Sequence, residues 1–239
     1  MIEHVLDTFW PRKCEICREP CDRPGRYICS DCHNRLPLIN TKGCCRICGR
    51  SIELFEGEFT CTDCKGRSKP AFDRAGSSMR FEDIARDIIH SYKFSGKIWL
   101  RDDFTDLLEA TARSRFNTEE IDFIVPMPAS FIHRLGRGYN QCAGLAKALA
   151  KRLGKPYAPF IAARRLFVKR QSGLDEDARK ENAKNSFFVL RPSMTTGSTI
   201  LVVDDIMTTG STFSECARAL KAHGAKKVYC VSLARSIRN

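Results

Sequence analysis

The chain has 239 residues, of which 43% are hydrophobic, and this combination excludes a protein that is disordered throughout. The length suits one ordinary domain together with a smaller module. No stretch reaches the roughly 20 apolar residues of a membrane-spanning helix, and the opening segment MIEHVLDTFW lacks the basic region of an export signal. We therefore expect a soluble protein of the cytoplasm.

The formal net charge of +12 is distributed unevenly along the chain. Residues 1–70 carry 12 Lys and Arg against 10 Asp and Glu, whereas residues 131–186 carry 13 against 4. A concentrated basic segment suits phosphorylated small molecules or nucleic acid, and charge alone does not separate these two kinds of partner.

Four CxxC pairs recur at nearly even intervals in the first part of the chain, which contains ten of the 13 cysteines. Two thiolates three positions apart chelate one ion from a tight turn, and two such turns complete the tetrahedral shell of structural zinc. Without an export signal, metal-bound thiolates are favoured over disulfides. The predicted metal ligands are Cys14, Cys17, Cys29, Cys32, Cys45, Cys48, Cys61 and Cys64.

The four CxxC pairs can be assigned to two zinc ions in two ways. Sequential pairing places the first two CxxC pairs on one zinc ion and the last two on a second, and its short loops lower the closure entropy. A cross-braced pairing is the alternative, and an iron–sulfur cluster is the alternative metal centre. Four thiolates leave no position for a catalytic water, so the predicted role is structural. We expect residues 1–70 to form this double zinc-ribbon module and residues 71–239 to form the main domain.

The main domain alternates helices with apolar strands. Apolar residues at helical spacing predict helices over Phe81–Phe94, Ile98–Phe116, Gln141–Leu153 and Phe213–His223. Continuous apolar runs predict strands over Ile121–Pro126, Thr199–Asp205 and Val228–Ala234. Uninterrupted apolar strands between helices indicate an α/β fold with a parallel sheet flanked by helices on both faces.

The segment ILVVDDIMTTGST carries the strongest functional signal. A buried strand delivers Asp204 and Asp205 to its carboxyl edge, where they can accept hydrogen bonds from ribose hydroxyls. The following turn leads into a helix whose backbone amides and neighbouring hydroxyls suit a phosphate. Ordinary turn and capping roles are the structural alternative for such residues. The candidate binding residues of the turn are Ile206, Met207, Thr208, Thr209, Gly210, Ser211 and Thr212.

These 13 residues resemble the signature by which type I phosphoribosyltransferases bind phosphoribosyl pyrophosphate (PRPP). The segments Tyr92–Lys97, Pro126–Ala150 and Arg170–Phe187 are similar to blocks of the ComF family, which joins a cysteine ribbon module to a phosphoribosyltransferase domain. Together with the CxxC pairs, the resemblance covers nearly the whole chain. One departure is Val168, where the family usually has Thr.

The resemblance implies a reaction in which PRPP binds with Mg²⁺, pyrophosphate leaves, and the ribosyl group passes to an acceptor that the sequence does not identify. Asp204 and Asp205 would be the catalytic carboxylates, and the backbone amides of Ala129 and Ser130 would meet the pyrophosphate. The segment Arg164–Asn185 resembles a mobile hood over the ligand and also reads as a solvated loop; its candidate cations are Arg164, Arg165, Lys169 and Arg170.

Members of the family are associated with competence and the handling of incoming single-stranded DNA, so single-stranded DNA and DNA-processing proteins are the implied macromolecular partners. The alternative to an enzyme is a binding protein that holds a ribose phosphate or single-stranded nucleic acid without turnover. Stacking of bases would then depend on few aromatic side chains near the basic segment, namely Phe131, Tyr139, Tyr157, Phe160 and Phe167.

Overall fold

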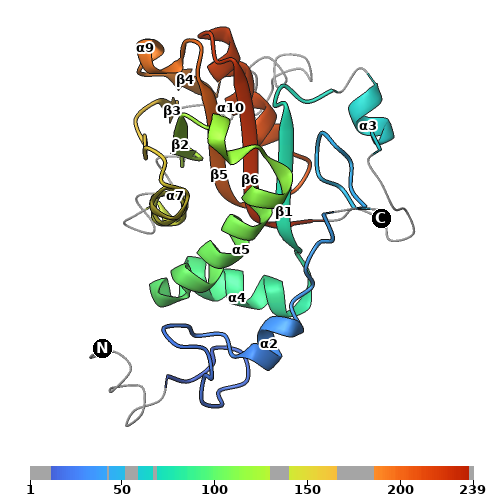
Figure 1. Cartoon of the computed structure of the whole chain (residues 1–239), viewed down its shortest axis with the longest axis vertical. Coiled ribbons are helices and arrows are strands. Elements are labelled where there is room, and N and C mark those ends of the chain that lie inside the picture. Colours follow the sequence, from blue (N-terminus) through green and yellow to red (C-terminus); the bar gives the residue numbers. More distant parts are fainter. Residues whose placement is uncertain are drawn as a thin grey trace, which may run out of the picture.

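The computed structural model describes residues 12–41, 43–51, 59–66, 69–129, 140–165 and 186–236. At its centre lies a four-stranded sheet in the order β1-β6-β5-β2, in which every neighbouring pair is parallel (Figure 1). The strands are β1 (Arg74–Arg80), β2 (Phe123–Pro126), β5 (Thr199–Met207) and β6 (Lys227–Arg235). The predicted α/β class with a parallel sheet is confirmed.

Helices cover both faces of this sheet because its central strands are apolar on both sides. Leu201 and Val203 of β5 pack with one group of helices, namely α4 (Asp83–Phe94), α5 (Arg101–Arg115) and α7 (Gln141–Leu153). Ile200 and Val202 point to the other face and pack with α10 (Ser211–Ala222). Burial of apolar strands between helices is the main source of stability in this kind of fold.

Shorter elements complete the described chain. They are the helices α2 (Ser30–Asn34), α3 (Thr62–Lys65) and α9 (Pro192–Thr195), the 3₁₀ turns η1 (Ile98–Leu100) and η2 (Thr118–Glu120), and an antiparallel pair of β3 (Ala162–Arg164) with β4 (Phe187–Val189). Of the helices in the described ranges, none combines the length and the apolar character needed to cross a bilayer.

Most predicted elements are confirmed, with differences at their ends. The helix Gln141–Leu153 has the predicted bounds, whereas the helix expected from Ile98 begins as the turn η1 and becomes α-helical at Arg101. Strand β5 continues beyond Asp205 to Met207. Strand β1 was not predicted, because its sequence RAGSSMR lacks an apolar run.

Strand β1 contains two buried serines, and each forms a hydrogen bond with a hydroxyl group of a neighbouring element. Ser77 Oγ lies 2.7 Å from Ser232 Oγ of β6, and Ser78 Oγ lies 2.8 Å from Thr111 Oγ1 of α5. Polar side chains tolerate burial when they are paired in this way. A strand held by hydroxyl pairs gives no hydrophobic pattern in the sequence.

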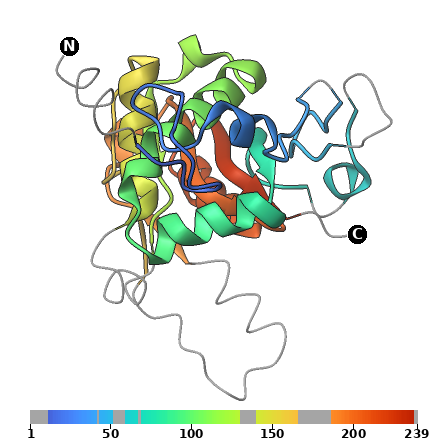
Figure 2. The same cartoon turned by 90° about the horizontal axis from the view of Figure 1, so that it is seen from below.

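The two cysteine-rich segments lie on different sides of the molecule, the first near α2, α4 and α5 and the second beside β1 and α3 (Figures 1 and 2). In the first, Arg26 donates to both carboxylate oxygens of Asp106 on α5, at 2.6 and 3.0 Å. In the second, the carbonyl oxygen of Ile47 accepts from the amide of Ala75 on β1 at 2.6 Å. Residues of each segment belong to a hydrophobic cluster of the main domain, so the boundary after residue 70 stays a prediction.

We predict that Gly49→Ala destabilises the protein more than Gly154→Ala. Both glycines have a positive φ, +70° and +65°, which costs an alanine about 1 kcal/mol. A Cβ on Gly49 would also lie 2.7 Å from the carbonyl oxygen of Ala75, whereas no atom lies within 4 Å of one on Gly154. This overpacking should lower the free energy of unfolding of Gly49→Ala by a further roughly 1–3 kcal/mol, as measured by urea denaturation. Equal losses in the two variants would contradict a close approach of the second segment to β1.

Candidate functional site

Two parallel strands end at the same edge of the sheet and bring the candidate residues together. Pro126 at the end of β2 lies opposite Val203 of β5, and the amide of Met127 donates to the Val203 carbonyl at 2.7 Å. The segment leading to the half-buried Ala129 therefore leaves the sheet level with Asp204. Ser130, the other residue predicted to meet pyrophosphate, lies outside the described residues.

The two aspartates form a compact group with a cysteine from α7. One ligand atom each from Cys142, Asp204 and Asp205 lies within 4.8 Å of the others. The Cys142 thiol donates to Asp204 Oδ1 at 3.2 Å, and the Asp205 amide donates to the same oxygen at 2.9 Å. On the other carboxylate, Asp205 Oδ1 forms an ion pair with Lys93 Nζ at 2.8 Å.

Burial and charge perturb the titration of this group. Burial, together with the charge of Asp205, raises the pKa of Asp204 from 3.8 to about 7. Burial also raises the pKa of the Cys142 thiol well above its usual value, and the charges of the two aspartates add to that shift. Cys142 is therefore a protonated hydrogen-bond donor at neutral pH and no thiolate nucleophile.

Side-chain to backbone hydrogen bonds hold Lys93 at this edge. The Gln141 side chain donates to the Lys93 carbonyl at 2.6 Å, which ties the end of α4 to the start of α7. Asn140 caps α7 by accepting from the Cys142 amide at 3.1 Å, and its amide group donates to the Met127 carbonyl at 3.2 Å. The ends of α4, α7 and β2 are thus fixed relative to one another.

Lys93, Asn140 and Cys142 were not predicted as site residues. Each lies within a segment whose resemblance to the ComF family was recognised, Tyr92–Lys97 or Pro126–Ala150. That resemblance was the available signal, but nothing in the sequence alone places a lysine of α4 against an aspartate more than a hundred positions away.

Some of the candidate residues in the turn after β5 are buried and others are exposed. Met207 is 2% exposed and Ile206 packs partly against the core, so the side chains of these two support the fold. Helix α10 starts at Ser211 after Gly210, whose φ is +79°, and no side chain caps it. The exposed side chains are those of Thr208, Thr209, Ser211 and Thr212. Exposed hydroxyls beside a helix N-terminus suit a phosphate.

Only the first two residues of the predicted hood, Arg164 and Arg165, are described. The Arg164 guanidinium, at the end of β3, lies over the Phe187 ring with 5.4 Å to its centroid. The Arg165 amide donates to the Ser186 carbonyl at 2.9 Å. Lys169, Arg170 and the unusual Val168 lie outside the described residues.

The eight predicted metal ligands form two four-sulfur clusters that follow the sequential pairing and not the cross-braced one. Within each cluster the sulfur atoms lie within 4.8 Å of one another; the clusters are Cys14, Cys17, Cys29 and Cys32, and Cys45, Cys48, Cys61 and Cys64. The Cys17–Cys29 and Cys48–Cys61 sulfur distances are both 3.7 Å. A tetrahedral ion with Zn–S bonds of about 2.3 Å requires about 3.8 Å, so the donor set fits structural zinc.

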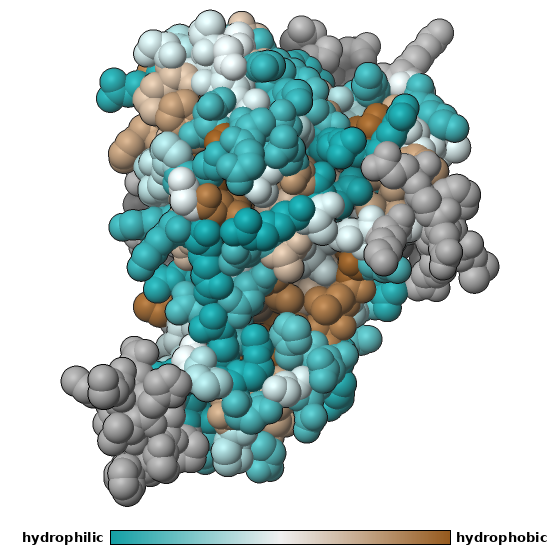
Figure 3. Space-filling model, viewed as in Figure 1, coloured by the Kyte–Doolittle hydropathy of each residue, from teal (hydrophilic) through white to brown (hydrophobic). Residues whose placement is uncertain are grey.

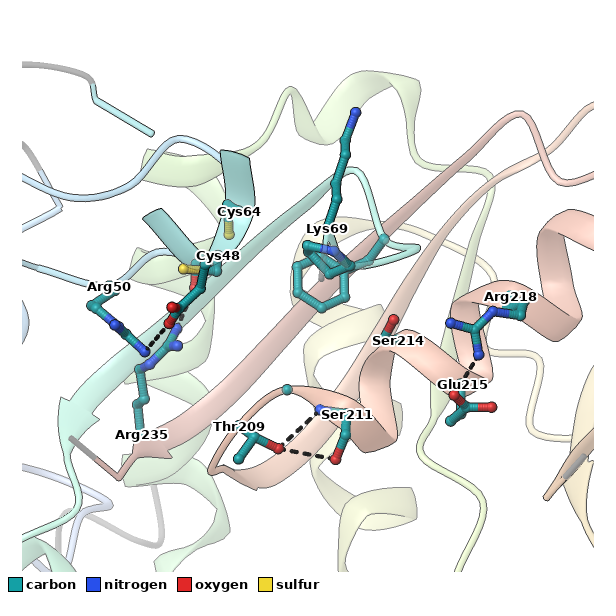
Figure 4. Close-up of a pocket in the computed structure, with 14 residues that line it drawn as sticks. Cys48, Arg50, Cys64, Lys69, Thr209, Ser211, Ser214, Glu215, Arg218 and Arg235 are labelled. Carbon is teal, nitrogen blue, oxygen red and sulfur yellow. Dashed lines mark hydrogen bonds and ion pairs between the residues drawn. The ribbon is translucent and has the colours of Figure 1, made fainter. Parts of the chain in front are cut away.

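A cavity of about 340 Å³ separates the second cluster from the turn after β5 (Figure 4). Cys48 and Cys64 line one side, and Thr209, Gly210 and Ser211 line the other. Two ion pairs also line it, Arg50 with Asp63 at 2.7 Å and Arg218 with Glu215. The second cluster is thus a close neighbour of the turn with the exposed hydroxyls.

We predict that Asp204→Asn makes the protein more stable than the wild type at about pH 8, with a difference that shrinks toward about pH 5.5. Because the folded pKa of Asp204 is raised, the wild type loses stability as pH rises through the interval between 3.8 and about 7. Asparagine does not titrate and removes this loss. Urea denaturation at several pH values with excess zinc measures it, and the exposed Asp87→Asn is the control. An unchanged pH dependence would show that Asp204 has no raised pKa.

Each part of the chain matches the model of a known domain family. The model of the phosphoribosyl transferase domain matches residues 140–238, and that of the double zinc ribbon domain matches residues 5–65. The first match contains β5, its two aspartates and the following turn. The second contains all eight ligands of the two cysteine clusters.

Relatives cover nearly the whole chain. Competence protein F of Haemophilus influenzae is 25% identical over 96% of this chain and 99% of its own. Competence protein ComFC of Streptococcus pneumoniae is 28% identical over 87% of each chain, and DNA utilization protein YhgH of Escherichia coli is 28% identical over 95% of this chain and 98% of its own. The chain is therefore a homologue of the competence F proteins, with a double zinc ribbon domain ahead of a phosphoribosyl transferase domain, as its resemblance to the ComF family predicts.

Proposed function

We propose that the protein binds PRPP with Mg²⁺ at the carboxyl edge of β5 and β2, releases pyrophosphate and transfers the ribosyl group to an acceptor. The observation that carries this proposal is the close group of Asp204 and Asp205 beside a helix start with exposed hydroxyls. A sugar phosphate presents the complementary pair of features, a vicinal diol and a dianion.

Each part of the ligand has a partner in this arrangement. The 5-phosphate lies on the turn from Thr208 to Thr212, and the ribose hydroxyls donate to the carboxylates of Asp204 and Asp205. The segment after β2, with the amides of Ala129 and Ser130, receives the pyrophosphate. Lys93, already paired with Asp205, contributes a cation toward a strongly anionic ligand.

The chemistry that this site supports is electrostatic. The C1–O bond to pyrophosphate breaks with its electron pair on the leaving group, and a lone pair of the acceptor forms the new bond to C1. Asp204 and Asp205 hold the sugar hydroxyls and face a reacting centre that becomes positive, which favours the transition state. Carboxylate oxygens also suit Mg²⁺, whereas the protonated Cys142 does not; when bound with PRPP, this ion neutralises charge on the departing pyrophosphate.

The names of the relatives support a link to DNA. Relatives of this chain are named for competence and for DNA utilization, so we propose that the acceptor or a regulatory partner is connected with DNA. A non-catalytic protein that senses PRPP at the same site is the alternative. Release of pyrophosphate with an amine, base or nucleic-acid acceptor separates the enzyme from the sensor.

We predict that Asp204→Asn combined with Asp205→Asn weakens PRPP binding by at least about 100-fold in calorimetry with Mg²⁺, since two charge-assisted hydrogen-bond acceptors are lost. Loss of two negative charges would by itself strengthen the binding of a polyanion. A weakened complex therefore identifies hydrogen bonding to the ribose.

The matched control for this experiment removes the same charge elsewhere. Asp87 on α4 is exposed and Asp102 on α5 is partly exposed, and their only described ion pairs are with neighbouring arginines, at 3.7 and 3.9 Å. Asp87→Asn with Asp102→Asn should leave PRPP affinity within about twofold, since the two residues lie outside the site. Unchanged binding in the Asp204 and Asp205 double variant would overturn the proposed site.

A basic groove between α5 and α7 favours single-stranded nucleic acid as a second ligand. It encloses about 670 Å³ and is lined by Arg101, Asp102, Gly144, Lys147, Ala148, Lys151 and Arg152. Arg152 is paired with Asp106 at 2.6 Å, whereas Lys147 and Lys151 are exposed on one face of α7. Of the aromatic residues expected to stack on bases, Phe160 is 71% exposed, and Tyr157 is half-buried. Phosphates along this groove would be neutralised by its excess of cations.

We predict that Lys147→Glu with Lys151→Glu weakens the binding of a single-stranded oligonucleotide by at least about tenfold at low salt. Two lost phosphate contacts should also reduce the slope of log K against log salt by about 1.4. Arg86→Glu with Lys226→Glu, an equal charge change on exposed residues elsewhere, should have a much smaller effect. Fluorescence anisotropy measures both quantities, and a wild type that fails to bind even at low salt removes this function.

A further inference from the structure

A buried arginine connects the second zinc ribbon to the strand that carries the aspartates. Arg235 ends β6, is 4% exposed, and lies opposite Met207 in the β5–β6 ladder. Its guanidinium donates to the carbonyl oxygen of Cys48, a ligand of the second cluster. The same Nη1 atom lies 3.8 Å from the sulfur of Met207. Figure 4 shows Arg235 between the ribbon and the turn after β5.

Met207, which Arg235 contacts, also packs against the turn. The terminal methyl group of Met207 lies against Gly210 so closely that a Cβ on Gly210 would approach it to 2.6 Å. The Met207 carbonyl accepts from the Ser236 amide at 3.0 Å, which fixes the backbone at the same point. A continuous series of contacts thus runs from Cys48 through Arg235 and Met207 to Gly210.

We propose that the second ribbon positions the turn 208–212 through Arg235, so that zinc at Cys45, Cys48, Cys61 and Cys64 sets the conformation of that turn and its affinity for a sugar phosphate. The half of this inference that concerns affinity rests on the function proposed above. The half that concerns the turn's conformation does not.

The physical reason is the cost of a buried guanidinium. Arg235 needs acceptors in place of water, and the Cys48 carbonyl belongs to a loop whose shape four metal–sulfur bonds define. When zinc leaves, that loop relaxes and the carbonyl no longer holds its position. The guanidinium then moves toward other acceptors or solvent, and Met207 loses the contact that keeps it beneath Gly210. A cavity lies between ribbon and turn, and Phe72, which lies beside Gly210, also lines it; the described polar contact between the two is the one through Arg235.

Another buried arginine holds the same ribbon without contacting the turn. Arg115 of α5 donates to Cys44 Sγ and to the Cys45 carbonyl, both at 3.0 Å, and to the Ala75 carbonyl of β1 at 3.3 Å. It is 7% exposed, so its burial matches that of Arg235. Replacing Arg115 therefore tests whether attachment of the ribbon alone affects the turn, without removing a contact to the turn itself.

The first ribbon supplies a second control. Its polar side-chain contacts with the main domain lead to α5 and to the η1 region: Arg23 pairs with Asp103 at 3.2 Å, and Glu15 accepts from Lys97 at 2.6 Å and from Trp99 at 2.8 Å. Among the described residues, none of these contacts reaches β5 or the turn. Loss of zinc from the first ribbon should leave the turn unchanged.

The test combines hydrogen exchange at the amides of residues 208–212, zinc content and PRPP titration. Arg235→Met should keep wild-type zinc, increase exchange in the turn at least about tenfold, and weaken PRPP binding about tenfold. Arg235→Lys should lie between the two, since a lysine donates to one acceptor without the planar fork. Arg115→Met should leave exchange in the turn at the wild-type value.

Zinc is then removed from one ribbon at a time. Cys64→Ser should reproduce the Arg235→Met exchange pattern, and Cys32→Ser should not. Stepwise chelation of the wild type, followed by the same exchange measurement, gives the answer even if a variant fails to fold. Unchanged exchange in Arg235→Met, or an equal response to loss of either zinc, overturns the inference. A wild type whose turn responds to zinc but which binds no PRPP overturns the proposed function and supports the coupling.

Discussion

Asp204 and Asp205 place two carboxylates close together near the carboxyl end of β5, whose flanks are buried, and water solvates them poorly there. Like charges at this distance raise the free energy of the folded state unless protons, cations or donors offset them. The protein supplies Lys93 to one carboxylate and the Cys142 thiol to the other. The start of α7, which carries Cys142, is tied to the segment after β2, and the end of α4, which carries Lys93, is tied in turn to α7. The local architecture follows from the need to keep this pair together.

Two neighbouring carboxylates that repel each other are explained if a bound ligand offsets their repulsion. Ribose hydroxyls are donors, and an accompanying cation adds positive charge, so a sugar phosphate would offset the repulsion between the two carboxylates. Stability given up in the free protein is then recovered in the complex. A purely structural role leaves the cost unexplained, because asparagine or serine at the end of β5 would complete the sheet without charge repulsion.

The cysteine-rich segments show why a small metal module can merge with its neighbour. Each segment has few apolar residues, so metal binding and docking must supply the stability that a core would otherwise give. The first docks through arginine–carboxylate pairs on α5, and the second through buried arginines that donate to its backbone carbonyls. Carbonyl acceptors in a metal-bound loop are fixed in place, which makes the second interface the more sensitive one to loss of zinc.

The sequence predicted those elements whose signals are local. Strands β5 and β6 have continuous apolar runs, and the CxxC pairs have ligand spacing, so both could be read without the structure. Strand β1 could not, because its stability comes from hydroxyl pairs with β6 and α5. The roles of Lys93, Arg115 and Arg235 were also missed, since a lone basic residue in a helix or strand looks like an ordinary surface position. Arg235 contacts a residue 187 positions away, so the dependence of the turn on the second ribbon exists only once the parallel sheet has brought the end of β6 beside β5. The contacts that define a binding site form only when distant parts of the chain have come together, so short-range sequence patterns do not predict them.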